Sequence, residues 1–470
     1  MRRPLHVSLA IAAAALALFG LIRFTFNAVA VREFGPEYVG ALGSMISTLT
    51  VVAVILASVP SVLATKFVAE FIGAGDASRA ARLFSGVVAT TGIMGTLAAV
   101  VLAVLRRPVG AGAMAVYVPL FGLYLVFKGA YFAFGEERHY ARAEALGALA
   151  FGIIFSIACL RRESPLATAS LLAHPLVFAL CAIMDHRSKF RAYGGLIELV
   201  QDWRQYGVYS IATFVNAMHG LGSYNLLVVL ASLFLDTATL GYLNVILATL
   251  SPLSYISTAY GAVAFPEMSH RHGEGNADGL RSLLWRSTLI LQVIGVLVSG
   301  AIVIAPDSIL VLLHVPAQRG LVLALCWVAV SLQFNMTSAP SGHYLNATRH
   351  VVRHALFSGM FLVAGTIVGL TALSICGVVG AGIMRFAVDG SLSCVRMVVA
   401  VRALRWAEGR LTSIVAGQVG MLVLLAAAVL GVPWAVTGAI WVATLATQLP
   451  SLIEVARHWG RDSRMGMVGM

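Results

Sequence analysis

The sequence has few charged residues and no cysteine pattern with a chemical function. Charged residues make up 11% of its 470 residues, whereas hydrophobic residues make up 59% and the mean hydropathy is +0.90. In a soluble chain roughly a quarter of the residues are charged. The low charged fraction therefore excludes a string of soluble domains. The five cysteines are odd in number and lack zinc-type spacing, which argues against a disulfide framework or a structural zinc site.

Motifs for chemistry are also missing from the sequence. It contains no phosphate-cradling glycine loop, no metal-ligand cluster and no nucleophile paired with a base. These absences argue against an enzyme and against an ATP-driven pump formed by this chain alone. We therefore expect no catalytic residue, no metal and no cofactor.

Long apolar runs recur along the whole chain. A membrane-spanning helix needs about 20 such residues, so we predict an all-α polytopic membrane protein with about fourteen transmembrane helices. Arg2 and Arg3 before an Ala/Leu-rich stretch resemble a signal peptide, but the apolar run continues to about Val31, so we interpret it as an uncleaved first helix. The predicted spans are 5–31, 38–63, 82–105, 113–134, 141–160, 165–184, 207–233, 237–264, 283–305, 320–345, 353–373, 377–400, 411–431 and 434–454.

The distribution of basic residues predicts the orientation of these helices. With a cytoplasmic N-terminus, 24 of the 32 Lys and Arg residues, Arg396 among them, fall on the cytoplasmic side, and this alternation continues to the C-terminus. Both termini are therefore expected in the cytoplasm. The net charge of +12 reflects this topology, and we expect no nucleic-acid partner. The predicted location is the cytoplasmic (inner) membrane of a bacterium.

A sequence repeat divides the chain into two lobes. Residues 38–50 (YVGALGSMISTLT) match residues 239–251 (TLGYLNVILATLS), with Gly40 opposite Gly241, and both are followed by a helix and a polar turn. The two copies are 201 or 202 residues apart and run in the same direction, which is typical of parallel transporter repeats. The alternative is a chance similarity between two helices with small residues. The repeat predicts two pseudo-symmetric six-helix lobes, 1–184 and 207–401, followed by two C-terminal helices and a tail, 402–470.

The segment between the lobes has a mixed composition. In the predicted linker, residues 185–206, the stretch 188–206 mixes basic and aromatic residues with Leu and Ile. This pattern indicates either an amphipathic segment on the cytoplasmic surface or a plain tether.

Two motifs resemble a known transporter family. Residues 32–40 (REFGPEYVG) are similar to the segment after the first helix of polysaccharide (O-antigen type) flippases, and Gly241-Tyr242 with Phe265-Pro266-Glu267-Met268-Ser269 resembles the pattern of their second lobe. These flippases belong to the multidrug/oligosaccharidyl-lipid/polysaccharide exporter superfamily. The resemblance implies that the chain moves a polyprenyl-diphosphate-linked oligosaccharide to the outer leaflet by alternating access, for surface polysaccharide biosynthesis.

This resemblance also implies partners and leaves two alternatives open. The expected partners are the polyprenyl-diphosphate-linked glycan, membrane lipids, a polysaccharide polymerase and glycosyltransferases, and a proton or sodium ion is the candidate coupling ion. The first alternative is a cation-coupled multidrug extruder of the same superfamily. The second is a membrane-embedded polysaccharide polymerase or ligase, which the short outer connections disfavour. The charge-free pair of helices between Leu411 and Ile453 either borders a groove for the polyprenyl chain or only packs against lipid.

Ionisable residues inside spans are the first candidates for a transport site, because such residues are costly in a membrane. Arg23 has no acidic residue three or four positions away and is a candidate phosphate ligand; the alternative is an arginine that reaches the interface or pairs with another helix. Arg385 and Asp389 either form an internal ion pair or line a cavity in which Asp389 titrates. Lys128 either lines the cavity or extends to the headgroups. Asp389 and Asp236 are the candidates for ion coupling.

Polar residues of two further helices are candidate ligands for sugar hydroxyls, because amides and phenols both donate and accept hydrogen bonds. Helix packing through the same side chains is the alternative. These residues are Asn216, His219, Tyr224, Asn225, Asn244 and Tyr255.

Overall fold

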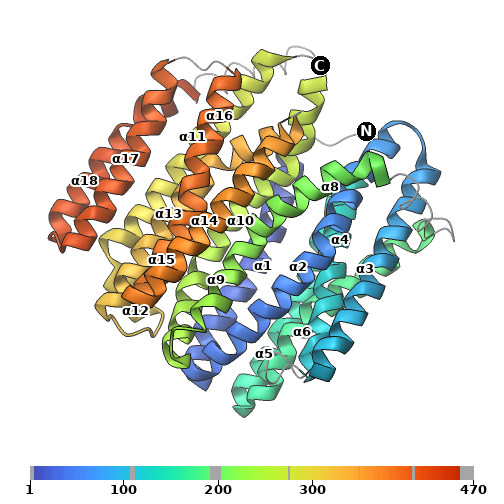
Figure 1. The fold of residues 1–470 in the computed structure, drawn as a ribbon, viewed down its shortest axis with the longest axis horizontal. Coiled ribbons are helices and arrows are strands. Elements are labelled where there is room, and N and C mark those ends of the chain that lie inside the picture. The colour runs from blue at the N-terminus through green and yellow to red at the C-terminus, as the bar shows by residue number, and fades with distance from the viewer. Residues whose placement is uncertain are drawn as a thin grey trace. The chain divides into compact units, whose positions relative to one another are not determined.

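The computed structural model describes residues 5–105, 112–190, 203–273, 276–348, 350–404 and 408–455 (Figure 1). Over these ranges the chain contains helices and no strand. The α-helices are α1 (Leu5–Phe34), α2 (Pro36–Gly73), α3 (Ala77–Leu105), α4 (Tyr117–Ala133), α5 (Glu137–Arg161), α6 (Ser164–His186), α8 (Trp203–Ala217), α9 (Ser223–Ala231), α10 (Thr237–Gly273), α11 (Ala277–Ile304), α12 (Pro306–Leu312), α13 (Arg319–Ala347), α14 (Val351–Cys376), α15 (Val378–Arg385), α16 (Ser391–Leu404), α17 (Glu408–Leu430) and α18 (Trp434–Ala446).

Fourteen segments of the described chain are long and apolar enough to cross a membrane. They follow the predicted spans in order, so the prediction of an all-α, multi-pass membrane protein is confirmed. The predicted segment 185–206 falls largely on residues 191–202, which lie outside the described residues.

The helices α2 and α10 extend well beyond the apolar runs that predicted them. They contain 38 and 37 residues, whereas the apolar runs end at about residues 63 and 264. At 1.5 Å per residue, 38 residues span about 57 Å, more than the hydrocarbon thickness of roughly 30 Å. The charged end of α2 therefore continues as helix, up to a turn in which Gly75 has a positive φ of 80°.

Two membrane spans change their helical geometry near the middle. The π-helical segment η3 (Met218–Gly222) joins α8 to α9, and η4 (Phe386–Gly390) joins α15 to α16. Each segment contains a candidate residue, His219 in η3 and Asp389 in η4. Single π-helical turns are frequent at functional positions, and the sequence pattern gave no sign of either.

Contacts between helices divide the chain into two compact units. Unit 1 comprises residues 1–263 and 351–363, and unit 2 comprises residues 264–350 and 364–470. These limits do not coincide with the predicted lobes, so the lobe boundaries stay a prediction.

In unit 1, α2 packs against α3 and α4, and α5 packs against α6 and α1. Six large side chains fill the interior of α3 to α6 and are almost completely buried: Phe84, Tyr124, Phe127, Tyr131, Tyr140 and Phe178. The ring centroids of Tyr124 and Phe178 are 4.7 Å apart. These buried aromatic side chains support helices α4, α5 and α6, which line a cavity beside α1.

In unit 2, α13 is the central helix and packs against α11, α15, α16 and α17. The C-terminal helices α17 and α18 lie side by side along α11 (Figure 1). Two hydrogen bonds join the last membrane span to α11. Gln292 Nε2 donates to Gln448 Oε1 at 2.8 Å, and Trp441 Nε1 donates to the Val296 carbonyl oxygen at 3.0 Å. A contribution of this pair to a polyprenyl groove stays a prediction.

Helices α2 and α10 approach each other at the two glycines that the repeat aligns. A Cβ at Gly40 would lie 3.0 Å from the Gly241 nitrogen, and a Cβ at Gly241 would lie 3.1 Å from the Gly40 nitrogen. The carbonyl oxygens of Thr237 and Pro36, also 201 residues apart, are nearer still. Contacts that are reciprocal between equivalent residues are those of a two-fold axis. Small residues allow two membrane helices to approach this closely.

We expect Gly40→Val to disrupt this crossing, because the new side chain would meet backbone atoms that cannot rotate away. Overpacking typically lowers the free energy of unfolding by about 1–3 kcal/mol, so the midpoint of thermal unfolding in detergent should fall. Gly92→Val is the matched control, since a Cβ at Gly92 in α3 meets nothing within 4 Å. Equal midpoints for the two variants would contradict the crossing.

Candidate functional site

Arg23 lies near the middle of the first membrane span, Ala13–Phe34. Its guanidinium hydrogen-bonds with the Tyr255 side chain of α10. It also lies over two aromatic rings, with its Cζ atom 5.9 Å from the Phe19 centroid and 5.5 Å from the Tyr224 centroid. None of the carboxylates that the structure describes forms an ion pair with it. Aromatic faces attract a cation without neutralising it, so the positive charge remains available.

The position of Arg23 follows from a close approach of α1 to α10 one turn earlier. A Cβ at Gly20 would lie 2.8 Å from the Pro252 Cα atom, which leaves room for no other residue. The Ser251 hydroxyl donates to the Gly20 carbonyl oxygen at 3.4 Å. This contact places the next turn of α1, with Arg23, beside Tyr255.

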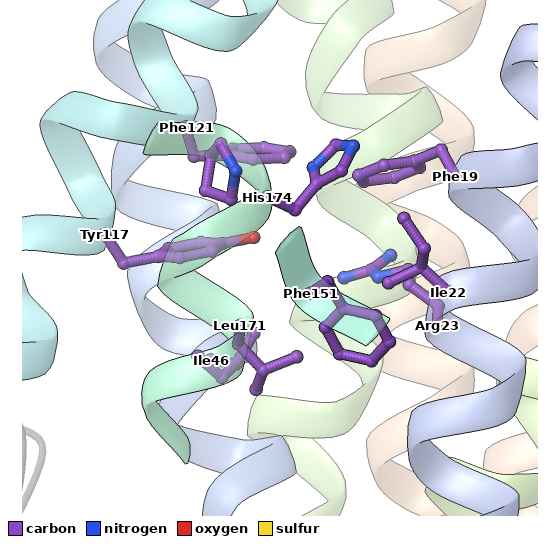
Figure 2. Close-up of a pocket in the computed structure, with 10 residues that line it drawn as sticks. Phe19, Ile22, Arg23, Ile46, Tyr117, Phe121, Phe151, Leu171 and His174 are labelled. Atoms are coloured by element: carbon purple, nitrogen blue, oxygen red, sulfur yellow. The ribbon is translucent and has the colours of Figure 1, made fainter. Parts of the chain in front are cut away.

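A cavity whose empty space, open solvent included, is about 430 Å³ adjoins the Arg23 side chain. Helices α1, α2, α4, α5 and α6 form its wall. Most lining side chains are apolar or aromatic, and the polar groups come from Arg23, Tyr117 and His174. Figure 2 shows the Arg23 guanidinium and the Tyr117 hydroxyl directed toward the same space, with the His174 ring beside them. A mostly apolar cavity with a few convergent polar groups is typical of a small-ligand site.

Behind His174 lies a completely buried carboxylate, Glu144 of α5. Its Oε1 atom accepts hydrogen bonds from the hydroxyls of Tyr124 and Tyr140 at 2.6 and 2.8 Å. Its Oε2 atom is 2.7 Å from His174 Nε2. Each carboxylate oxygen therefore has a hydrogen-bond partner, as a buried polar group requires. Sequence analysis missed Glu144 and His174, although both lie inside predicted spans and the rule that selected Arg23 applies to them.

The predicted ligands of unit 1 separate into several groups. Tyr224 and Tyr255 surround Arg23, as described above. Asn216 Oδ1 accepts from the Ser358 hydroxyl at 2.7 Å. His219 is buried in η3.

Two further amides of unit 1 keep a buried polar atom with no hydrogen-bond partner, Asn225 Oδ1 and Asn244 Nδ2. Asn244 also packs against Gly43, the residue that the repeat aligns with it, 201 positions earlier in the sequence. Lys128 lies in α4 and does not line the cavity. Its cavity role, like the sugar-binding role of the amides, stays a prediction.

Asp236 caps the N-terminus of α10 at an exposed position. Its carboxylate accepts hydrogen bonds from the Thr239 hydroxyl at 2.6 Å and from the Thr239 amide at 2.9 Å. These hydrogen bonds lower the pKa of Asp236. The geometry is that of a helix N-cap, and nothing around Asp236 adds support for the coupling role that we predicted.

In unit 2, Arg385 and Asp389 form an ion pair, with Nη2 and Oδ2 2.7 Å apart. Arg396 interacts with the same carboxylate and packs against Gly342 of α13, where a Cβ would lie 3.5 Å from its Nε atom. Arg396 lies within the span Val378–Arg402, and its predicted cytoplasmic side stays a prediction. A coupling role for Asp389 stays a prediction.

This architecture is shared with known transporters. The sequence matches no protein-family profile and no curated protein. Solved structures of MATE family multidrug resistance transporters of the MOP superfamily are similar to it. The outward-facing conformation of one such transporter has a TM-score of 0.65 and 16% identity over 86% of this chain and 97% of its own. The inward-facing conformation of one has a TM-score of 0.63 and 15% identity over 84% and 98%.

A third similar structure is a MOP superfamily transporter from Pyrococcus furiosus, described as having a binding pocket of reversed polarity that suggests a different function. Its TM-score is 0.62, with 13% identity over 86% of this chain and 98% of its own. At these identities the similarity shows the fold alone: the chain is a multi-pass membrane protein with a MATE-like transporter fold. The polysaccharide flippase family, to which two motifs point, is a finer assignment than these structures give.

We expect Glu144→Gln to destabilise the protein, because the amide has one oxygen where the carboxyl group has two to bond Tyr124, Tyr140 and His174. A buried polar group left without its partner costs about 1–3 kcal/mol, so the free energy of unfolding should fall by about this amount. The measurement is thermal or denaturant unfolding in detergent. Glu137→Gln, in the first turn of the same helix, should leave stability unchanged. A Glu144→Gln variant as stable as Glu137→Gln would contradict a stabilising role of these hydrogen bonds.

Proposed function

We propose that this chain is a lipid flippase, a non-enzymatic transporter that moves a polyprenyl-diphosphate-linked oligosaccharide from the cytoplasmic to the outer leaflet by alternating access. The observation that carries this proposal is Arg23, a cation near the middle of a membrane span that aromatic side chains hold beside a cavity. Its cargo would be made by glycosyltransferases and used by a polysaccharide polymerase.

The electrostatics of the site favour an anionic cargo. A diphosphate diester carries two negative charges that cannot enter a layer of roughly 30 Å of hydrocarbon unaided. Arginine matches phosphate oxygens with a planar set of donors, and Arg23 has no competing carboxylate in an ion pair. The tyrosines around it also suit sugar hydroxyls. The two motifs that resemble polysaccharide flippases agree with this cargo.

A cation-coupled multidrug extruder is the second candidate. Two observations favour it: the similar solved structures include multidrug resistance transporters, and Glu144 is a buried carboxylate next to the cavity. For a cationic drug, however, Arg23 would repel the cargo from this cavity. The lipid-linked anion is therefore the leading proposal, and a membrane-embedded polymerase or ligase is the least supported alternative.

The test compares Arg23→Glu with Arg23→Lys and Arg32→Glu in a deletion strain. Charge reversal at Arg23 should reduce surface polysaccharide about 10- to 100-fold, since hydrogen bonds to a charged group are worth about 1.5–3 kcal/mol. Arg23→Lys keeps the charge but loses the planar donors and should retain part of the export. Arg32→Glu is the matched control at an exposed position whose side chain is 66% accessible.

Two further readouts separate the candidates. Membrane levels of each variant are measured by immunoblot, and ethidium efflux is measured in the same strains. The flippase proposal requires lipid-linked oligosaccharide to accumulate when Arg23 is reversed. Normal surface polymer in Arg23→Glu, together with ethidium efflux that depends on this chain, would overturn it in favour of the extruder.

A further inference from the structure

Lys66 of α2 is a second cation in unit 1 that aromatic rings hold. Its Nζ atom lies 3.5 Å from the ring centroid of Tyr209 on α8 and 5.2 Å from that of Phe67. The two rings pack edge to face, with their centroids 5.6 Å apart. Aromatic faces attract an ammonium group without cancelling its charge, so Lys66 is held in the same manner as Arg23.

The Lys66 ammonium group keeps its hydrogen-bond donors for a ligand. An ammonium group has three donors, and over the described part of the chain this one makes no hydrogen bond and no ion pair. Glu70, four residues later on α2, is exposed and beyond ion-pair distance of Lys66. The Lys66 side chain is half-buried. A ligand can therefore reach the ammonium group from outside, and no described carboxylate has to leave first.

A lysine on the same side of the membrane has its charge compensated. Lys189 follows α6, and the four spans from α3 to α6 return the chain to the side on which α2 ends. Its Nζ atom lies 3.8 Å from the Phe134 ring centroid, and it also forms an ion pair with Glu136. A ring and a carboxylate thus occur together at Lys189. Of these two lysines, Lys66 is the one whose charge stays uncompensated among the described residues.

Lys66 and Arg23 lie at different depths in the membrane. Lys66 is the first charged residue of α2 after an uncharged stretch, residues 38–65, so it marks the level at which hydrocarbon gives way to headgroups. Tyr209, below Lys66, and Tyr224, below Arg23, belong to one span, Gly207–Ala231. Their 15 positions of separation correspond to about 22 Å of helix. One cation therefore lies at the end of this span and the other deep inside the membrane.

The chemistry at Lys66 suits a phosphate group that enters from the headgroup layer. The phosphates of a membrane lipid lie at the boundary between hydrocarbon and water, which is the level that Lys66 marks. Lysine binds phosphate as a compact point charge with rotatable donors, whereas arginine offers a planar, fixed set. A lysine therefore accepts a phosphate in many orientations, which suits a first contact, and an arginine suits the oriented site that follows.

We propose that Lys66, on the Tyr209 ring, is an entry site that binds the diphosphate of a lipid-linked cargo before this group reaches Arg23. The cargo would load at the membrane face where α2 ends, which the distribution of basic residues predicts to be cytoplasmic. This order agrees with transport from the cytoplasmic to the outer leaflet. The inference rests on the proposed function, because it takes the cargo to be a polyprenyl diphosphate diester.

The experiment isolates the entry site by removing the deeper one. Binding is measured by isothermal titration calorimetry with the full-length Arg23→Gln variant in phosphatidylcholine nanodiscs, and empty discs give the background from partition into lipid. The probe is decyl methyl diphosphate with one ester on each phosphate, which carries the two charges of the cargo. We expect Arg23→Gln to bind this probe through Lys66.

In the Arg23→Gln background, Lys66→Gln should lower the affinity for the probe about tenfold or more, because a charge-assisted hydrogen bond is lost. Lys66→Arg keeps a cation that stacks on the ring and should restore most of the affinity. Lys189→Gln is the matched control, a lysine on a ring whose charge Glu136 already compensates, and it should leave the affinity unchanged. Equal affinity with and without Lys66→Gln would overturn the inference.

The outcomes also separate this inference from the proposed function. Probe binding by the wild type that disappears in Arg23→Gln would overturn the entry site alone. Lys66-dependent binding that is equal in the wild type and in Arg23→Gln would support the entry site and contradict the phosphate role of Arg23. No binding by the wild type would overturn both.

The source of the phosphate is tested with phosphatidylglycerol, added to the discs at the mole fraction of the probe. It should not displace the probe, because it carries one phosphate charge where the diphosphate carries two. Displacement would identify a general headgroup site and would overturn the inference.

A second measurement leaves Lys66 unchanged and decides the question if Lys66→Gln does not fold. Acetylation of the lysines in Arg23→Gln is followed by mass spectrometry with and without the probe. The bound probe should slow the acetylation of Lys66 and leave that of Lys189 unchanged. Equal acetylation of Lys66 in both samples would overturn the inference.

Discussion

The cost of a permanent cation inside a membrane span is the constraint on which the first unit depends. A guanidinium cannot give up its charge, so Arg23 must be stabilised by its surroundings or drawn to the interface. The protein stabilises it with a phenol and two aromatic faces. Carboxylates would solve the same problem by cancelling the charge. Because the aromatic groups do not cancel it, the positive potential extends into the adjoining cavity, and the close contact at Gly20 is what brings these groups to the arginine.

The second unit solves the same problem in the opposite way. Asp389 pairs directly with Arg385 and also interacts with Arg396, so two guanidinium groups share one carboxylate. In the first unit the buried carboxylate, Glu144, has a histidine and two tyrosines as its partners instead of an arginine. The difference lies in which groups donate hydrogen bonds to the carboxylate. Neutral donors leave the arginine uncompensated, whereas a paired arginine has a large part of its charge already satisfied.

Sequence could predict the spans, because apolar runs of sufficient length allow only a helix in a bilayer. It also aligned Gly40 with Gly241, and these residues meet in space because the repeat relates them. The predicted ends of α2 and α10 come too early in the sequence, because charged residues continue each helix beyond the hydrocarbon. Tyr117, Tyr224 and Tyr255 come from three different helices, and only tertiary packing brings them to Arg23. The pairing of Glu144 with His174 likewise follows only from the packing of α5 against α6.

The fold alone cannot decide what crosses the membrane, because one fold supports different cargoes. The similar structures illustrate this point, since they include multidrug resistance transporters and a transporter whose reversed pocket polarity suggests a different function. What discriminates is the sign of the charge that a cavity leaves uncompensated. Among the residues that line the Arg23 cavity, Arg23 carries the permanent charge, and it is positive. A cationic cargo would therefore have to overcome repulsion in a medium of low dielectric constant, where charge interactions are strong, whereas a diphosphate would relieve it.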